Sequence, residues 1–189
     1  MILRLALLCG LFLLPNVCQA GLMFTFSDNG TGGLKIVGTG SGTVTDDQSG
    51  AVWDILNFDT DFLAGAGSFS TPATGMLKNL GGSGLSSPMD ITVNEFRFDK
   101  DGAGDDIQFR LDDPIIFMTG DRFEFTMMAE IASFDYSQLV AGTHSETDQD
   151  NADEIFGVTT LVVNAAVPEP TSLLIFAAVP AALLLRRRS

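Results

Sequence analysis

Hydrophobic and polar residues alternate with a period of two in several stretches of the central chain. Between 122 and 127, the odd positions hold Phe, Phe and Met, and the even positions hold Arg, Glu and Thr. Side chains of a β-strand point alternately to its two faces, so this pattern predicts a strand with one buried face. The same spacing within 91–98 predicts that Ile91 and Val93 lie on the face opposite to Phe96 and Phe98.

Seven segments show such alternation together with β-forming residues, and clusters of Gly, Asp, Ser and Pro separate them. The segments are 22–26, 34–44, 51–58, 91–98, 107–111, 122–131 and 155–163. No long stretch keeps helical spacing; the nearest candidate is a single turn over 136–140, and the longest expected loop is 71–88. We therefore expect an all-β fold, an antiparallel β-sandwich of jelly-roll type, forming one domain over residues 21–164.

The aromatic residues predict a packed core in this domain. Thirteen of the fifteen phenylalanines lie within residues 21–167, against one tryptophan, Trp53, and one tyrosine, Tyr136. Sugar-binding surfaces favour Trp and Tyr, which combine a flat face with a polar edge. Phe at alternate strand positions is typical of core packing, so no aromatic binding stripe is expected.

The first 20 residues have the pattern of a secretory signal peptide. Arg4 precedes an apolar run from Leu5 to Leu14, and Cys18 and Ala20 provide small residues at the −3 and −1 positions of a cleavage site. The ten-residue run is short of the roughly 20 residues of a membrane-spanning helix, which disfavours an N-terminal anchor. We therefore expect signal peptidase to cleave between Ala20 and Gly21.

Both cysteines of the chain, Cys9 and Cys18, lie in this N-terminal segment. The mature chain is therefore expected to lack cysteine. This excludes disulfides, thiol catalysis and zinc sites with cysteine ligands from the exported form, although the compartment would permit disulfides.

Residues 165–189 consist of a polar motif, an apolar run and a basic end. The motif is Val167, Pro168, Glu169 and Pro170, the apolar run is 173–185, and the basic end is Arg186, Arg187 and Arg188. The prolines disfavour a helix and hold the motif extended, as a processing enzyme requires. The apolar run predicts a short helix that inserts into the membrane, and the arginines stop translocation on the cytoplasmic side.

This tail resembles the PEP-CTERM sorting signal of bacterial surface proteins. The stretch from Val167 to Pro170, followed by Thr171 and Ser172, matches the family motif, and the apolar run and the arginines match its other two parts. The resemblance covers the tail and the signal peptide, not the central domain. It implies that an exosortase-type membrane protease recognises the motif and removes the tail. It also implies transient anchoring in the inner membrane of a Gram-negative bacterium, before delivery to the cell surface or extracellular matrix.

Charge and missing motifs exclude several classes of function. Residues 21–167 hold 23 acidic and 6 basic residues, a formal net charge of −17, which repels the phosphates of nucleic acids. The chain has no Gly-x-Ser-x-Gly motif, and its one histidine, His144, lies in a polar stretch where we expect it to be solvated. We therefore expect no enzymatic activity. Glycoside hydrolysis by paired carboxylates stays open as an alternative.

An acidic loop over 99–106 is the candidate cation site. Its carboxylates are those of Asp99, Asp101, Asp105 and Asp106. Calcium takes six to eight oxygen ligands, and the loop begins with the Asp-x-Asp of an EF-hand loop. However, Ala103 and Arg110 stand at positions 5 and 12 of that loop, where an EF-hand has metal ligands. Because Asp and Gly are also typical turn residues, we expect a hairpin turn, with a calcium site as the alternative.

These patterns predict an exported structural or adhesive protein. The expected function is that of a surface or extracellular-matrix protein, sorted by an exosortase-type pathway in an organism that makes extracellular polysaccharide. The alternative is a calcium-dependent carbohydrate-binding module that recognises this exopolysaccharide. A large stabilisation of the fold by millimolar calcium would favour the alternative.

Overall fold

The computed structural model describes residues 21–49, 53–58, 61–82, 88–100, 105–114, 116–145 and 156–164. The predicted signal peptide, the sorting motif, the apolar run 173–185 and the arginine cluster lie outside these residues. The strands are β1 (Gly21–Asp28), β2 (Leu34–Thr43), β3 (Gln48–Ser49), β4 (Trp53–Phe58), β5 (Gly67–Gly82), β6 (Met89–Lys100), β7 (Asp105–Leu111), β8 (Ile116–Phe117), β9 (Asp121–Ile131), β10 (Gly142–Ser145) and β11 (Thr160–Val163). A short 3-10 helix, η1 (Tyr136–Gln138), occupies the predicted single turn.

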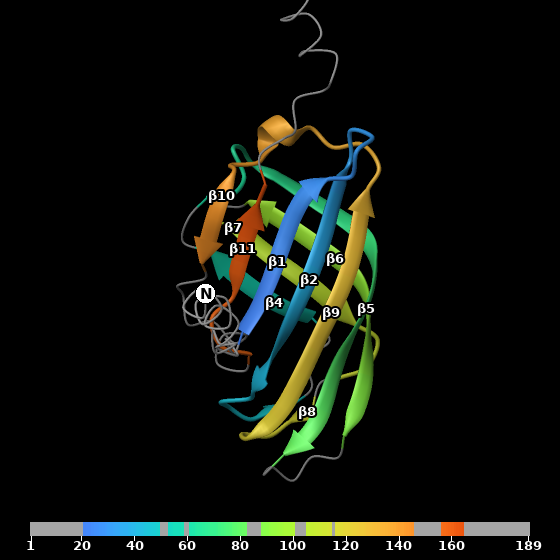
Figure 1. Cartoon of the computed structure of the whole chain (residues 1–189), viewed down its shortest axis with the longest axis vertical. Helices are drawn as coiled ribbons and strands as arrows, with labels where there is room; N and C mark the ends of the chain where they lie inside the picture. Colours follow the sequence, from blue (N-terminus) through green and yellow to red (C-terminus); the bar gives the residue numbers. More distant parts are fainter. Residues whose placement is uncertain are drawn as a thin grey trace, which may run out of the picture.

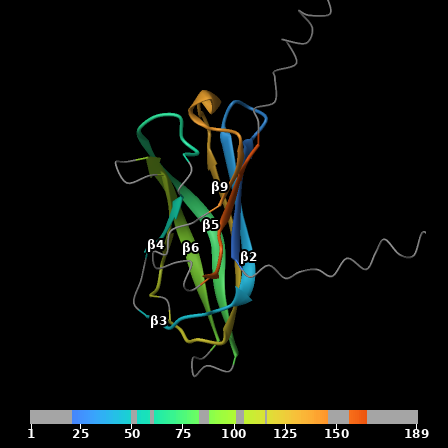
Figure 2. The ribbon, with the colours of Figure 1, turned by 90° about the vertical axis from the view of Figure 1, so that its left-hand side faces the viewer.

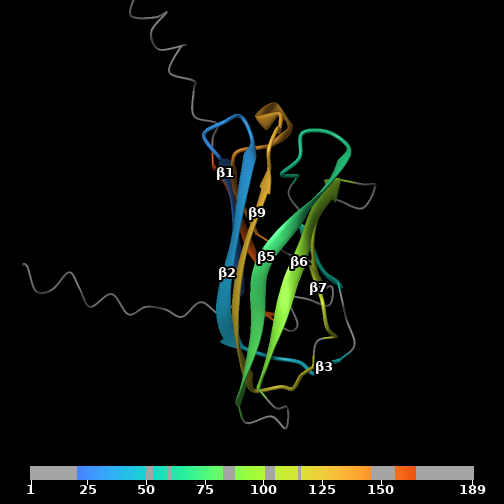
Figure 3. The same ribbon diagram turned by 90° about the vertical axis from the view of Figure 1, so that its right-hand side faces the viewer.

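Nine strands form one mixed sheet in the order β10-β11-β1-β2-β9-β5-β6-β7-β4. All neighbours are antiparallel except β1 and β11, which are parallel. The sheet curls, so that β6, β7 and β4 pass behind β1, β2 and β9 (Figure 1). Seen from the two sides, the β1-β2-β9 half faces the β5-β6-β7 half (Figures 2 and 3). The all-β expectation is confirmed.

Phenylalanine side chains fill the space between the two halves of the sheet. The Phe24 ring on β1 lies 5.7 Å from the Phe96 ring on β6, and the Phe26 and Phe98 rings lie 5.2 Å apart. Twelve of the thirteen phenylalanines in the domain are buried, and Phe69 packs against the same core. The expectation of a phenylalanine core is therefore confirmed. Burial of apolar surface of this kind is the main term that stabilises a small domain.

The face assignment predicted for residues 91–98 was wrong. Ile91 and Val93 are buried, but so are Phe96 and Phe98 in the same strand, β6. The register with β7 shifts between Val93 and Glu95, where β6 carries one extra residue. This β-bulge reverses the alternation, so both apolar pairs face the core.

The segment predicted as the longest loop is also a strand over most of its length. β5 is the 16-residue strand Gly67–Gly82, and it lies between β9 and β6 in the sheet. Its Gly, Ser, Thr and Pro residues resemble those of a loop. Pro72 is accommodated because the register with β6 shifts between Pro72 and Gly75, and pairing with β9 begins at Ala73. Proline is tolerated in a sheet at such a bulge.

The two edges of the sheet are linked by the segments next to them. Residues 62–64 follow β4, and residues 138–140 precede β10. Ala64 N–H donates to Gln138 C=O at 2.8 Å, and Val140 N–H donates to Phe62 C=O at 2.8 Å. This bridge brings the two ends of the curled sheet together. None of the helices in the described ranges is long and apolar enough to cross a membrane.

Candidate functional site

The predicted processing sites flank the sheet. β1 begins at Gly21, the first residue after the predicted cleavage, and Ala20 lies outside the described residues. β11 ends at Val163, whereas the sorting motif begins at Val167. In the part of the chain that the structure describes, the strand pairings of the nine-stranded sheet lie between Gly21 and Val163. Removing both predicted signals would therefore leave these pairings in place.

The aspartates of the 99–106 loop divide between the two faces of the sheet. Asp99, near the end of β6, forms an ion pair with Arg97 at 2.6 Å. Asp106 of β7 pairs with Asp99 of β6, and Asp105 pairs with Lys100. Because successive side chains of a strand alternate, Asp105 and Asp106 point to opposite faces of the sheet. Asp105 is completely buried, with Ile107 and Phe109 following on the same face of β7. Asp101 lies outside the described residues.

Asp105 forms a polar cluster with the segment that follows β4. Its Oδ2 accepts a hydrogen bond from Leu63 N–H at 2.5 Å. Lys100 Nζ lies 3.7 Å from Asp105 Oδ1, donates to Leu63 C=O at 3.0 Å and pairs with Asp61 at 2.6 Å. Burial raises the pKa of the Asp105 carboxyl, against the hydrogen bond from Leu63 and the charge of Lys100. The cluster holds Leu63 against the end of β6 and the start of β7.

Asp105 therefore has a structural role, because it accepts a hydrogen bond from Leu63 N–H, and Asp99 is engaged in an ion pair with Arg97. Within the described ranges, no three His, Cys, Asp or Glu side chains lie close enough to hold a metal ion. Calcium binding by Asp99, Asp101, Asp105 and Asp106 stays a prediction, because one of the four lies outside those ranges.

The expectation that His144 is solvated was wrong. His144 lies on β10 and is only 6% exposed. Its Nε2 lies 3.0 Å from Val140 C=O, and its ring meets the Phe62 ring edge-on at a centroid distance of 6.2 Å. The polar neighbours in sequence did not reveal this burial because alternate residues of an edge strand face opposite sides.

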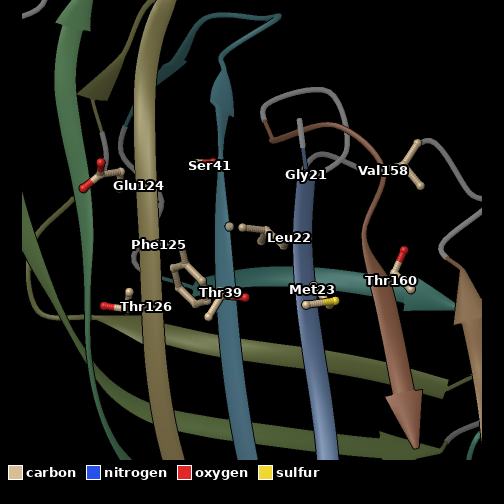
Figure 4. Close-up of a pocket in the computed structure, with 11 residues that line it drawn as sticks. Gly21, Leu22, Met23, Thr39, Ser41, Glu124, Phe125, Thr126, Val158 and Thr160 are labelled. Atoms are coloured by element: carbon tan, nitrogen blue, oxygen red, sulfur yellow. The ribbon is translucent and has the colours of Figure 1, made fainter. Parts of the chain in front are cut away.

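A pocket of about 520 Å³ lies over β11, β1, β2 and β9 (Figure 4). Most of the side chains that line the pocket are on the faces of these strands that point to solvent, away from the phenylalanine core. Glu124 and Thr126 come from β9, Thr39 and Ser41 from β2, and Met23 from β1. Thr160 of β11 and Val158, just before that strand, complete the opposite side.

The strand register arranges the lining side chains in two rows. One row runs from Gly21 through Ser41 to Glu124, and the other from Thr160 through Met23 and Thr39 to Thr126. Neighbouring side chains in such rows have Cβ atoms about 4.5–5.5 Å apart. The pocket thus contains the hydroxyl groups of Thr39, Ser41, Thr126 and Thr160 and one carboxylate, that of Glu124. The pocket brings together residues from distant parts of the chain. The alternation within each strand does not predict which strands are neighbours, so the sequence did not predict the pocket.

Chemically, the pocket is suited to a ligand that is both hydroxylated and partly apolar. Thr and Ser hydroxyls donate and accept hydrogen bonds, and the Glu124 carboxylate accepts them. Met23 and Val158 provide apolar surface, being 48% and 54% exposed. Pockets of 300–1,000 Å³ with a few placed polar groups are typical of small-ligand sites.

No protein-family model matches this chain, and no curated protein is significantly similar to it.

Proposed function

We propose that this chain is an exported protein of the bacterial surface or extracellular matrix, where it has a structural or adhesive role. An exosortase-type protease would process its PEP-CTERM-like tail after signal peptidase has removed residues 1–20. The observation that carries the proposal is the position of the fold between the two predicted signals. Among the described residues, the pairings of the nine-stranded sheet lie within Gly21–Val163, so loss of both predicted signals would leave these pairings in place.

A β-sandwich of jelly-roll type is the finer description that we propose for the domain. Two observations support it: the halves of the curled sheet face each other, and Phe24 of one half meets Phe96 of the other.

Processing of variants in the native host tests the sorting proposal. Glu169→Ala should still insert into the membrane but resist processing, so that the precursor with its tail accumulates. Replacing Arg186, Arg187 and Arg188 with Ser should instead weaken membrane retention, because the cytoplasmic hold is lost. Glu130→Ala, an exposed position on β9, is the matched control and should be processed normally. Processing of Glu169→Ala at the wild-type rate would contradict an exosortase-type pathway.

Carbohydrate binding is the second candidate function, and the hydroxyl-lined pocket favours it. Its calcium-dependent form requires a metal at the 99–106 loop. In that form, millimolar calcium should raise the melting temperature, and Asp101→Asn with Asp99→Asn should abolish the increase. Melting curves with calcium and with chelator measure this effect. Identical curves would contradict calcium-dependent binding, and carbohydrate binding without a metal ion would be the remaining version of this candidate function.

A further inference from the structure

We propose that the pocket over β11, β1, β2 and β9 binds an uncharged sugar unit directly, without a metal ion. This inference rests on the proposed adhesive function and assigns it a site and a ligand class. It departs from a calcium-dependent module, because the proposed contacts all come from the pocket and none from the 99–106 loop.

The polar groups of the pocket match the hydroxyl pattern of a sugar ring. Glu124 and Thr126 are two residues apart on β9, so they point to the same face. Ser41 and Thr39 are their register partners on β2. These four side chains form a square of acceptors and donors, and a carboxylate at one corner can accept hydrogen bonds from two adjacent sugar hydroxyls.

The apolar side of the pocket matches the C–H face of the same ring. Met23 lies beside Thr39 in the row, and Val158 lies across from it next to β11 (Figure 4). Met23 and Val158 are 48% and 54% exposed, a large fraction for apolar side chains. A Met side chain is flexible and polarisable, and it adapts to irregular apolar surfaces. A sugar ring that covered both side chains would remove this apolar surface from water.

The charges around the pocket favour an uncharged sugar over a uronate or a sulfated sugar. Among the described lining residues, none is Lys, Arg or His, and Glu124 is the only acidic one. Lys78 is the register partner of Glu124 on β5, but in the part of the chain that the structure describes the two form no ion pair. The domain as a whole carries a formal net charge of −17, which further repels anionic ligands.

The polar side chains of the pocket stand on paired strands, an arrangement that limits the conformational entropy lost on binding. Its polar side chains stand on β2, β9 and β11, and β2 and β9 pair along ten residues. Thr side chains are β-branched and stiff at the first side-chain torsion. Sites built on regular strands hold their groups more accurately than sites on loops.

Calorimetric titration of the full chain tests the site. The chain is purified in a detergent without a sugar headgroup and kept in chelator. The probes are neutral glucan, mannan and galactan tetrasaccharides and, for comparison, a uronate tetrasaccharide. At least one neutral probe should bind with a Kd on the order of 1 mM, and the uronate should bind more weakly.

Matched variants then locate the binding. Glu124→Gln should weaken the binding of the neutral probe about tenfold, because it replaces one charged acceptor oxygen by an amide N–H donor. Thr126→Val should weaken it about fivefold, because it removes a hydroxyl group. Glu130→Gln, on the same face of β9 but outside the pocket, should bind like the wild type. All three positions are exposed, and melting curves confirm that the variants fold.

Three results would overturn the inference: no binding of any neutral probe, a requirement for calcium, or equal losses in Glu124→Gln and Glu130→Gln. The titration uses purified chain and does not depend on export. A chain that binds the sugar but is not exported contradicts only the proposed sorting. An exported chain that fails to bind contradicts only the pocket assignment.

Discussion

Individual residues of the sheet are constrained by the aromatic core that they face. Gly38 of β2 is the clearest case, because the rings of Phe24 and Phe125 occupy the space beside its Cα. A Cβ at this position would lie 2.8 Å from a ring atom of each. The alternation around Gly38 predicted a strand, but the need for glycine depends on two residues that lie far away in sequence.

Gly38→Ala should destabilise the protein. The added methyl group forces the two rings apart, and overpacking of this kind costs about 1–3 kcal/mol. Gly65→Ala is the control, since nothing lies within 4 Å of its added Cβ. It should be neutral or stabilising by up to about 1 kcal/mol. Urea unfolding of both variants measures the difference; equal stabilities would contradict the packing described for β2.

The buried carboxyl of Asp105 predicts a pH dependence. Its pKa is raised in the folded state, chiefly by burial, so the folded protein binds a proton more readily than the unfolded chain. Its contribution to stability is then greatest below the ordinary pKa of Asp and is lost as the pH rises through the raised value. Asp105→Asn lacks this titration. Urea unfolding at several pH values should show the wild type losing stability relative to Asp105→Asn as the pH rises through that window, and a relative gain would contradict the burial of an ionisable group there.

The sequence predicted regular strands correctly, and the predictions were wrong for strands with irregular pairing or loop-like composition. The predicted strands at 22–26, 34–44, 107–111 and 122–131 agree with β1, β2, β7 and β9, where alternation is unbroken. β5 was missed because its Gly, Ser, Thr and Pro residues resemble a loop. The phase of β6 was wrong because a one-residue bulge gives the same change of phase in the alternation as a strand with apolar residues on both faces. Both errors lie where β5, β6 and β7 shift register against one another.

A proline substitution in β5 distinguishes a central strand from the predicted loop. Met76 pairs with Thr126 of β9 on one side and Thr92 of β6 on the other. Met76→Pro should destabilise the protein by about 1–3 kcal/mol, because it removes a ladder donor and leaves the acceptor without its partner. Met76→Ala, which removes side-chain packing alone, is the control. If thermal melting places both variants at the same temperature, residues 71–82 do not form the central strand.

At the scale of the whole molecule, the chain combines one sheet domain with the two predicted sorting signals. The all-β class and the phenylalanine core could be predicted, because period-two patterns and composition determine them locally. The pocket could not be predicted, because it depends on the register of four strands. The proposed sorting signals are short linear motifs, and such motifs are predicted from the sequence rather than from the fold.

The most direct test of the account is the intact mass of the protein recovered from the cell surface or the surrounding medium of the native host. Cleavage after Ala20 and processing at the Val167–Pro170 motif predict a chain that begins at Gly21 and lacks the apolar run 173–185 and the three arginines. Every described strand would remain in that product. A surface protein that retains Met1, or one that keeps the complete tail to Ser189, would contradict the proposed export and sorting.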